Sequence, residues 1–166
     1  MKTAEYWIER LSLEKHPEGG YYKETYRSDL SLEASLMEEG LEGERAVSTS
    51  IYFLLPSGER SVFHRIKSDE LWHFYAGSSL SIHMIAEDGE YFVSSLGLDL
   101  DAGEEPQRMV KANTWFGAMV DDPDSYTLVG CTVVPGFDFR DFEMANSAEL
   151  LEAYPQHSDI ISKLAL

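Results

Sequence analysis

The chain has 166 residues, of which 43% are hydrophobic, and it carries a formal net charge of −17. This length suits one domain with a sizeable core, and we interpret residues 1–166 as a single domain. The negative charge argues against nucleic acids and anionic lipid surfaces as partners, because phosphate recognition needs clustered lysine and arginine. No apolar run approaches the roughly 18 residues needed to span a bilayer, so we expect no membrane segment.

Cys131 is the only cysteine. It therefore cannot form an intrachain disulfide or contribute to a cysteine-based zinc cluster within one chain. The first ten residues mix charged and apolar side chains and lack the apolar centre of a secretory signal. Together these features favour a cytoplasmic location.

The N-terminal segment predicts a short amphipathic helix. Thr3 is a suitable N-cap, and Trp7, Ile8 and Leu11 fall on one helix face. The helix should end before residues 16–20, whose proline and two glycines predict a tight turn.

Residues 21–27 alternate in the manner of a strand. The alternation places Tyr22, Glu24 and Tyr26 on one face, which suits a strand that borders a polar cavity. Residues 29–44 are rich in acidic side chains and predict a solvated excursion, with room for a brief helical turn.

The remainder of the chain alternates short apolar segments with turn signals. Strands are predicted at 47–55, 60–66, 70–76, 79–86, 90–96, 107–111, 115–120 and 126–134. Residues 147–166 predict two short helical pieces separated at Pro155. Many short strands with few helices are typical of a sandwich or barrel, so the predicted fold class is all-β with short N- and C-terminal helices.

The most informative stretch reads Gly58-x5-His64-x-Ile66-x3-Glu70-x6-Gly77. It resembles the first signature of the cupin superfamily, Gly-x5-His-x-His-x3-Glu-x6-Gly, at every position except the second histidine. The resemblance implies a cupin double-stranded β-helix, or jelly-roll, barrel. In metal-dependent cupins the two histidines and the glutamate hold the ion, and the hydrocarbon side chain of Ile66 has no lone pair to donate.

The second cupin signature supplies a fourth metal ligand, a histidine. Its best match begins near Lys111 and places Phe116 at the histidine position. A phenyl ring cannot coordinate a metal, so two of the four ligands that the resemblance implies are missing. We therefore expect neither a metal nor another cofactor.

Further blocks resemble one small cupin family of unknown function. They are residues 16–28, 49–55, 68–74, 113–116 and 134–143, and together they cover the chain nearly from end to end. That family is similar in its jelly-roll to the deoxythymidine-diphosphate-dehydrorhamnose 3,5-epimerase group, the RmlC-like proteins. The resemblance implies a homodimer and a small-molecule ligand inside the barrel.

The resemblance and strand parity together select His64 and Glu70 as candidate catalytic residues. Both should project into the barrel, where Glu70 would orient His64 or raise its pKa. The epimerase group uses a histidine base and a tyrosine acid to move a proton next to a carbonyl without a metal, and His64 occupies a similar place.

Candidate ligand-binding residues are selected by type and by position. They are Tyr22, Glu24, Tyr26, Tyr52, Arg60, Trp72 and Trp115. The tyrosines are candidate acids, and Arg60 shares the parity of His64 and would neutralise a phosphate. Parity places His73 on the opposite side of its strand from Glu70.

Three functions stay open on the sequence alone. The first is a protein that binds a carbohydrate, a nucleotide-sugar or another small molecule and acts as a metal-free isomerase or epimerase. The second is a metal-dependent oxygenase or hydrolase, which would need an unconventional ligand such as His73 or His83. The third is a non-catalytic metabolite sensor.

Overall fold

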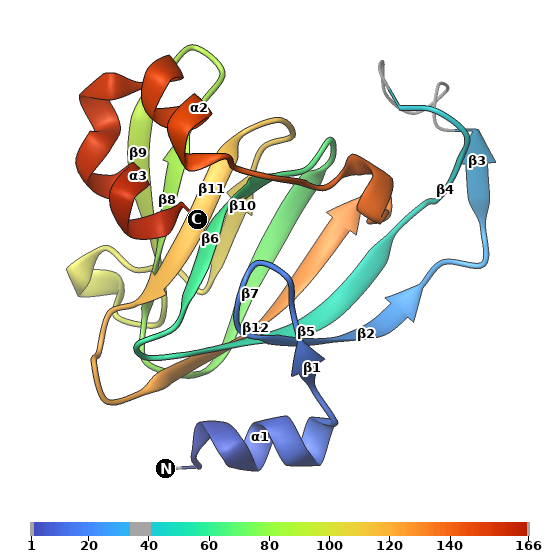
Figure 1. The fold of residues 1–166 in the computed structure, drawn as a ribbon. Coiled ribbons are helices and arrows are strands. Elements are labelled where there is room, and N and C mark those ends of the chain that lie inside the picture. The colour runs from blue at the N-terminus through green and yellow to red at the C-terminus, as the bar shows by residue number, and fades with distance from the viewer. Residues whose placement is uncertain (1, 34–40, 166) are drawn as a thin grey trace.

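The computed structural model describes residues 2–33 and 41–165, and two antiparallel sheets form the framework of the fold (Figure 1). The six-stranded sheet has the order β1 (Glu14–Lys15), β2 (Tyr21–Arg27), β5 (Thr49–Pro56), β12 (Tyr126–Val134), β7 (Asp69–Gly77), β10 (Gln107–Val110). The five-stranded sheet has the order β13 (Glu143–Met144), β6 (Arg60–Arg65), β11 (Trp115–Val120), β8 (Leu80–Ile85), β9 (Tyr91–Leu96). A separate pair joins β3 (Ser31–Glu33) to β4 (Glu44–Ala46).

Short helices lie at both ends of the chain, as the sequence predicts. They are α1 (Ala4–Leu11), α2 (Ser147–Ala153) and α3 (Ser158–Leu164), with 3-10 turns η2 (Leu100–Ala102), η3 (Phe139–Asp141) and η4 (Pro155–His157). The hydroxyl of Thr3 accepts a hydrogen bond from the Tyr6 backbone N–H, which confirms Thr3 as the N-cap of α1. None of the described helices is long and apolar enough to cross a membrane.

The main core lies between the two sheets, and alternation along the strands builds it. Phe53, Trp72 and Val129 point inward from the six-stranded sheet, and Ile82 and Phe116 point inward from the five-stranded sheet. The outward residues form two smaller clusters, one under α1 and one under α2 and α3. The apolar contacts on both faces fix which side chains can reach the interior.

All nine strands predicted between residues 21 and 134 are present, with ends that differ by at most two residues. The four strands that the sequence did not predict, β1, β3, β4 and β13, have only two or three residues each. Such short segments show no alternation to recognise. The two ends of the acidic stretch pair as β3 and β4. Residues 34–40 between them lie outside the described residues, so the helical turn for which the sequence leaves room stays a prediction.

The two glycines of the Gly58–Gly77 motif differ in the space available for a side chain, and this difference predicts how much a substitution at each would destabilise the protein. Both have positive φ, but a Cβ on Gly58 would meet nothing within 4 Å, whereas a Cβ on Gly77 would lie 1.9 Å from the Tyr126 carbonyl oxygen. We expect Gly58→Ala to cost about 1–2 kcal/mol of left-handed backbone strain. Gly77→Ala should cost more than about 3 kcal/mol, because backbone must move. Urea unfolding of both variants tests this, and equal losses would contradict it.

Candidate active site

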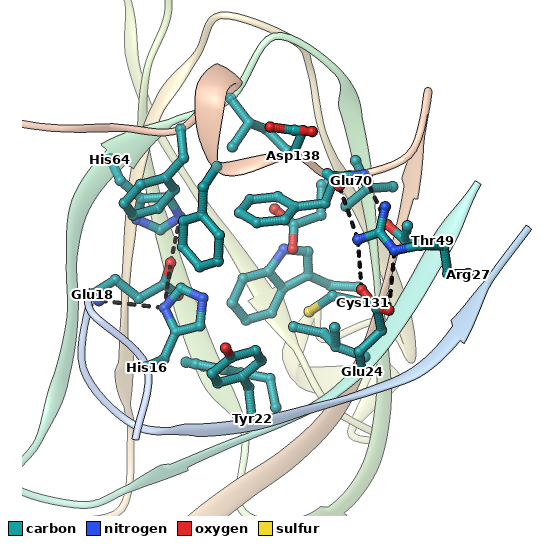
Figure 2. A pocket seen from close by; sticks show the side chains of 18 residues that line it. His16, Glu18, Tyr22, Glu24, Arg27, Thr49, His64, Glu70, Cys131 and Asp138 are labelled. Carbon is teal, nitrogen blue, oxygen red and sulfur yellow. Dashed lines mark hydrogen bonds and ion pairs between the residues drawn. The ribbon is translucent and has the colours of Figure 1, made fainter. Parts of the chain in front are cut away.

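A cavity of about 480 Å³ is lined by both sheets, by the turn at residues 16–20 and by the segment that follows β12 (Figure 2). Five of the residues selected from the sequence line it: Tyr22, Glu24, His64, Glu70 and Trp72. His16, Glu18, Arg27, Cys131, Asp138 and the three phenylalanines at 137, 139 and 142 line it as well. His73 does not line it, in agreement with the parity of its strand.

The turn at residues 16–20 carries Glu18 into the cavity. It connects β1 to β2, and the Gly19 N–H donates to the His16 carbonyl at 3.0 Å. The Val62 N–H of β6 donates to the Glu18 carbonyl at 2.8 Å, so the turn is fixed against the opposite sheet. A Cβ on Gly19 would lie 2.1 Å from the Arg60 carbonyl oxygen, so this close approach requires glycine.

Glu18 is the carboxyl group that contacts His64. Its Oε2 lies 3.0 Å from Nε2 of His64, and its Oε1 accepts from the Ser61 hydroxyl at 2.9 Å. The other ring nitrogen of His64, Nδ1, lies 2.7 Å from the Val62 carbonyl oxygen, which can only accept, so Nδ1 carries a proton. Because both ring nitrogens are occupied, the orienting role that we expected for Glu70 is taken by Glu18.

Burial keeps the imidazole of this pair uncharged and favours the neutral form of Glu18. It lowers the pKa of His64 to about 4, against the opposing effect of the hydrogen bond to Val62. Burial also raises the pKa of Glu18, although His16 and the Ser61 hydroxyl act in the other direction. Because Nδ1 carries a proton and Oε2 of Glu18 lies 3.0 Å from Nε2, this contact holds one proton between the carboxyl and the ring, and the pair can transfer it.

Glu70 is a second buried acid in the same cavity. Burial raises its pKa to about 8, and the nearby Glu18 acts in the same direction, whereas contacts with Cys131 and Trp72 oppose the rise. Glu70 and Trp72 are two residues apart on β7, so they share a face and both line the cavity. Near pH 7 most Glu70 side chains are neutral carboxylic acids that can donate a hydrogen bond.

Ion pairs support another part of the wall, and Figure 2 shows the pair between Arg27 and Glu24. Arg27 binds Glu24 through two hydrogen bonds of 3.1 and 2.6 Å, and it also donates to the Phe137 carbonyl oxygen at 3.2 Å. Asp138 accepts two hydrogen bonds from the Arg140 guanidinium, at 2.9 and 2.8 Å, and these hold the pKa of Asp138 below its usual value.

The segment after β12 adds aromatic rings to the wall. Phe137, Phe139 and Phe142 pack edge to face with ring centroids 5.0 to 6.1 Å apart. A buried ion pair anchors the segment, in which Arg45 of β4 donates to both carboxylate oxygens of Asp141 at 2.7 and 2.8 Å. Residues 134–143 stood out in the sequence only as one of the blocks that resemble the cupin family of unknown function, and the structure shows that this block lines the cavity.

Two β-bulges overturn the cavity positions expected for Tyr26 and Arg60. Between Glu24 and Tyr26 the register of β2 shifts against β5, so Arg27 lines the cavity and Tyr26 is exposed on the outer face. In β6, His64 pairs with Phe116 of β11 and Ser61 pairs with Ala118, so β6 has one extra residue in this interval. The extra residue turns Arg60 to the opposite face from the one that alternation predicts, and Arg60 is exposed.

Strict alternation overturns the positions expected for Tyr52 and Trp115. Ile51 and Phe53 face the cavity, so Tyr52 faces outward and packs in the cluster under α1. The ring of Phe116 points inward, 4.1 Å from that of His64. Its neighbour Trp115 therefore points outward into the cluster under α2 and α3, where the Arg65 guanidinium lies 4.3 Å above its ring.

Sequence reasoning missed Glu18, the carboxyl group that contacts His64. The only local signal was a glutamate between a proline and a glycine pair, in a turn too tight to be solvated on all sides. His16 lies beside it, with Nδ1 3.4 Å from Glu18 Oε2 and accepting from the Glu18 backbone N–H at 3.3 Å. Burial lowers the pKa of His16, so this ring is neutral as well.

The metal centre implied for metal-binding cupins does not fit these residues. Within residues 2–33 and 41–165, no three His, Cys, Asp or Glu side chains are arranged to hold a metal ion. Ile66 and Phe116 stand where two of the ligands would be. The nitrogens of His64 are already engaged by Glu18 and Val62.

Comparisons with known proteins agree with this architecture. The chain is 32% identical over 143 residues to the uncharacterized protein YML079W of Saccharomyces cerevisiae, covering 81% of this chain and 71% of that protein. The structure of SO0799 from Shewanella oneidensis has a TM-score of 0.90 and 44% identity, over 100% of this chain and 99% of that one. A hypothetical protein from Leishmania major has a TM-score of 0.91 and 40% identity, over 99% of each chain.

The family model described as "Cupin superfamily (DUF985)" matches residues 5–145. The match confirms the resemblance stated from the sequence, and it confirms the all-β cupin jelly-roll with short terminal helices. With most of its length matched by this one model, the chain belongs to the DUF985 family of the cupin superfamily.

Proposed function

We propose that this protein binds a small molecule in its cupin cavity and catalyses a proton transfer on it, as an isomerase or epimerase that uses its own side chains. One observation carries the proposal: the buried Glu18–His64 pair holds one proton that can move between an oxygen and a nitrogen 3.0 Å apart. A carboxyl and an imidazole sharing a proton, with a neutral acid in the same cavity, are suited to general acid–base catalysis.

The reaction proceeds on a ligand with a C–H bond next to a carbonyl. The shared proton shifts to Nε2 of His64, which leaves Glu18 as a carboxylate backed by an imidazolium. Glu18 then accepts the proton of the C–H bond, and that electron pair moves to the carbonyl oxygen, which accepts a hydrogen bond or a proton from Glu70. Return of a proton to carbon restores the carbonyl in an isomerised or epimerised product, with no net oxidation.

The experiment that tests this function starts from the molecule that co-purifies with the protein. Mass spectrometry of a denatured sample identifies that molecule, and the pure compound is incubated with the enzyme in D₂O. We expect deuterium to enter at the carbon next to its carbonyl. A molecule that binds the cavity and gains no deuterium over prolonged incubation would contradict catalysis and favour a metabolite sensor.

We also propose that the protein is a homodimer that pairs through the outer face of the six-stranded sheet. Tyr26, Tyr75, Met109 and Val134 are exposed apolar side chains on β2, β7, β10 and β12 of that sheet. An uncovered apolar sheet face is typical of an association surface.

Light scattering after gel filtration tests the dimer. We expect the mass of two 18.8 kDa chains, and the mass of one chain for the double variant Tyr75→Lys, Val134→Lys. As a matched control, Leu98→Lys changes an exposed leucine after β9 of the other sheet and should leave the dimer intact. A wild-type protein of single-chain mass would contradict the proposal.

We further infer a cytoplasmic location, which the free and buried thiol of Cys131 supports. Subcellular fractionation of the native host tests it, and recovery in an extracellular fraction would contradict it.

A further inference from the structure

The cavity wall is rich in ionisable groups, yet its charges cancel near pH 7. Glu18 and His64 share one proton, and burial favours the neutral forms of His16 and Glu70. Glu24 and Asp138 are neutralised by two-point contacts with Arg27 and Arg140. Among the described lining residues Arg27 is the sole arginine or lysine, so the wall offers no unpaired cation to an anionic ligand.

One buried donor in the wall is not fully satisfied. The indole N–H of Trp72 makes no hydrogen bond of standard geometry to a described residue, although this side chain is only 1% exposed. A buried N–H without an acceptor costs free energy, which a ligand acceptor would recover. The indole interacts with the carboxyl of Glu70 and lowers its pKa, but near pH 7 that carboxyl is mostly neutral and accepts less strongly than a carboxylate, so a ligand carbonyl can compete for the N–H.

Aromatic rings make up much of the remaining wall. Tyr22, Phe53, Phe137, Phe139 and Phe142 line the cavity together with Trp72. His16 packs edge-on against Tyr22, with ring centroids 4.6 Å apart, which fixes the tyrosine ring beside the Glu18 turn. Flat apolar walls with a few buried polar groups are suited to a ligand with a flat apolar face.

We propose that the cavity takes an uncharged ligand with a flat apolar face, whose carbonyl oxygen accepts a hydrogen bond from the Trp72 indole N–H. This inference rests on the proposed function, because it names the ligand class for the same site. It excludes nucleoside-diphosphate sugars, since their phosphates would need a cation that this wall already uses. The carbonyl held by Trp72 is the group next to which Glu18 moves the proton.

Matched probes test the ligand class on the wild-type protein. Calorimetry or ligand-observed NMR compares acetophenone with ethylbenzene, which lacks the carbonyl, and with 4-acetylbenzoate, which adds a negative charge. We expect acetophenone to bind about three- to tenfold more tightly than ethylbenzene, the range for one net hydrogen bond, and 4-acetylbenzoate to bind more weakly than acetophenone by tenfold or more. Thymidine should likewise bind more tightly than thymidine diphosphate.

Two variants sharpen the test. Trp72→Phe keeps an aromatic ring, although a smaller one, and removes the N–H. Lost apolar contact affects both probes, so the expected change is about a three- to tenfold fall in the ratio of acetophenone affinity to ethylbenzene affinity. Glu24→Gln frees Arg27 from its ion pair and should strengthen 4-acetylbenzoate binding relative to acetophenone.

Three outcomes would overturn the proposal: no binding of acetophenone at millimolar concentration, tighter binding of the anionic member of either pair, or an unchanged ratio of acetophenone affinity to ethylbenzene affinity in Trp72→Phe. The proposed reaction fails separately. If the probes bind in the expected order and the co-purified ligand gains no deuterium, the ligand class stands and the proton transfer does not.

Discussion

Glu18→Gln is expected to slow deuterium exchange into the bound ligand by about 100- to 10,000-fold, the contribution typical of a general base. Glutamine has the shape of the protonated carboxyl: its oxygen can accept from Ser61, and its NH₂ can donate to Nε2 of His64. The variant should therefore fold normally and bind its ligand. It cannot accept a proton from carbon, so the loss falls on the rate.

The matched control for this prediction is Glu152→Gln, an exposed glutamate on α2, which should exchange at the wild-type rate. Mass spectrometry of the ligand in D₂O gives the rate, and thermal unfolding confirms that the variants are folded. Full exchange by a folded Glu18→Gln protein would show that another group is the base. His64→Gln should also slow exchange, because the carboxylate of Glu18 then lacks its imidazolium partner.

Glu70→Gln is expected to make the protein more stable at alkaline pH than the wild type. The wild-type carboxyl has a folded-state pKa of about 8 against an ordinary value of 4.5, so the native state holds its proton more tightly than the unfolded chain does. The contribution of this raised pKa to the free energy of unfolding is fully present below pH 4.5 and is lost as the pH rises through 8. At 1.36 kcal/mol per pH unit, the loss reaches up to about 5 kcal/mol.

The uncharged glutamine lacks this pH dependence. The difference in the free energy of unfolding between Glu70→Gln and the wild type should therefore be smallest near pH 4.5 and largest near pH 9. Urea unfolding across this range measures it, since the effects of His64 and Glu18 are present in both proteins and largely cancel. Glu152→Gln should follow the wild-type curve. A difference that is constant with pH would show that Glu70 is ionised in the folded protein at neutral pH.

The cavity positions of His64 and Glu70 could be predicted because the signal was local. Their place in a short motif that resembles the first cupin signature selected them, and alternation placed Glu70 and Trp72 on one face of β7. The same reasoning separated His73 from the cavity. Long strands with a buried face leave few choices of register, so the pattern of apolar residues is informative there.

The remainder of the site depends on features that alternation cannot express. The bulges in β2 and β6 add one residue each. Because of them, Arg27 lines the cavity in place of Tyr26, and Arg60 does not line it. Glu18 reaches His64 from a turn far away in the chain, through a contact that only the packing of one sheet against the other creates. The aromatic segment at 137–142 reaches the cavity through its anchor at Arg45.

The protonation state of His64 is the most direct measure of this account. Two-dimensional ¹⁵N NMR of the imidazoles, assigned with His64→Gln, follows its two ring nitrogens from pH 5 to 8. We predict a neutral ring with the proton on Nδ1 over the whole range, as burial and the contacts with Val62 and Glu18 require. A His64 ring that gains its second proton near pH 6.5, or that carries its only proton on Nε2, would contradict a carboxylic acid proton held between Glu18 and His64.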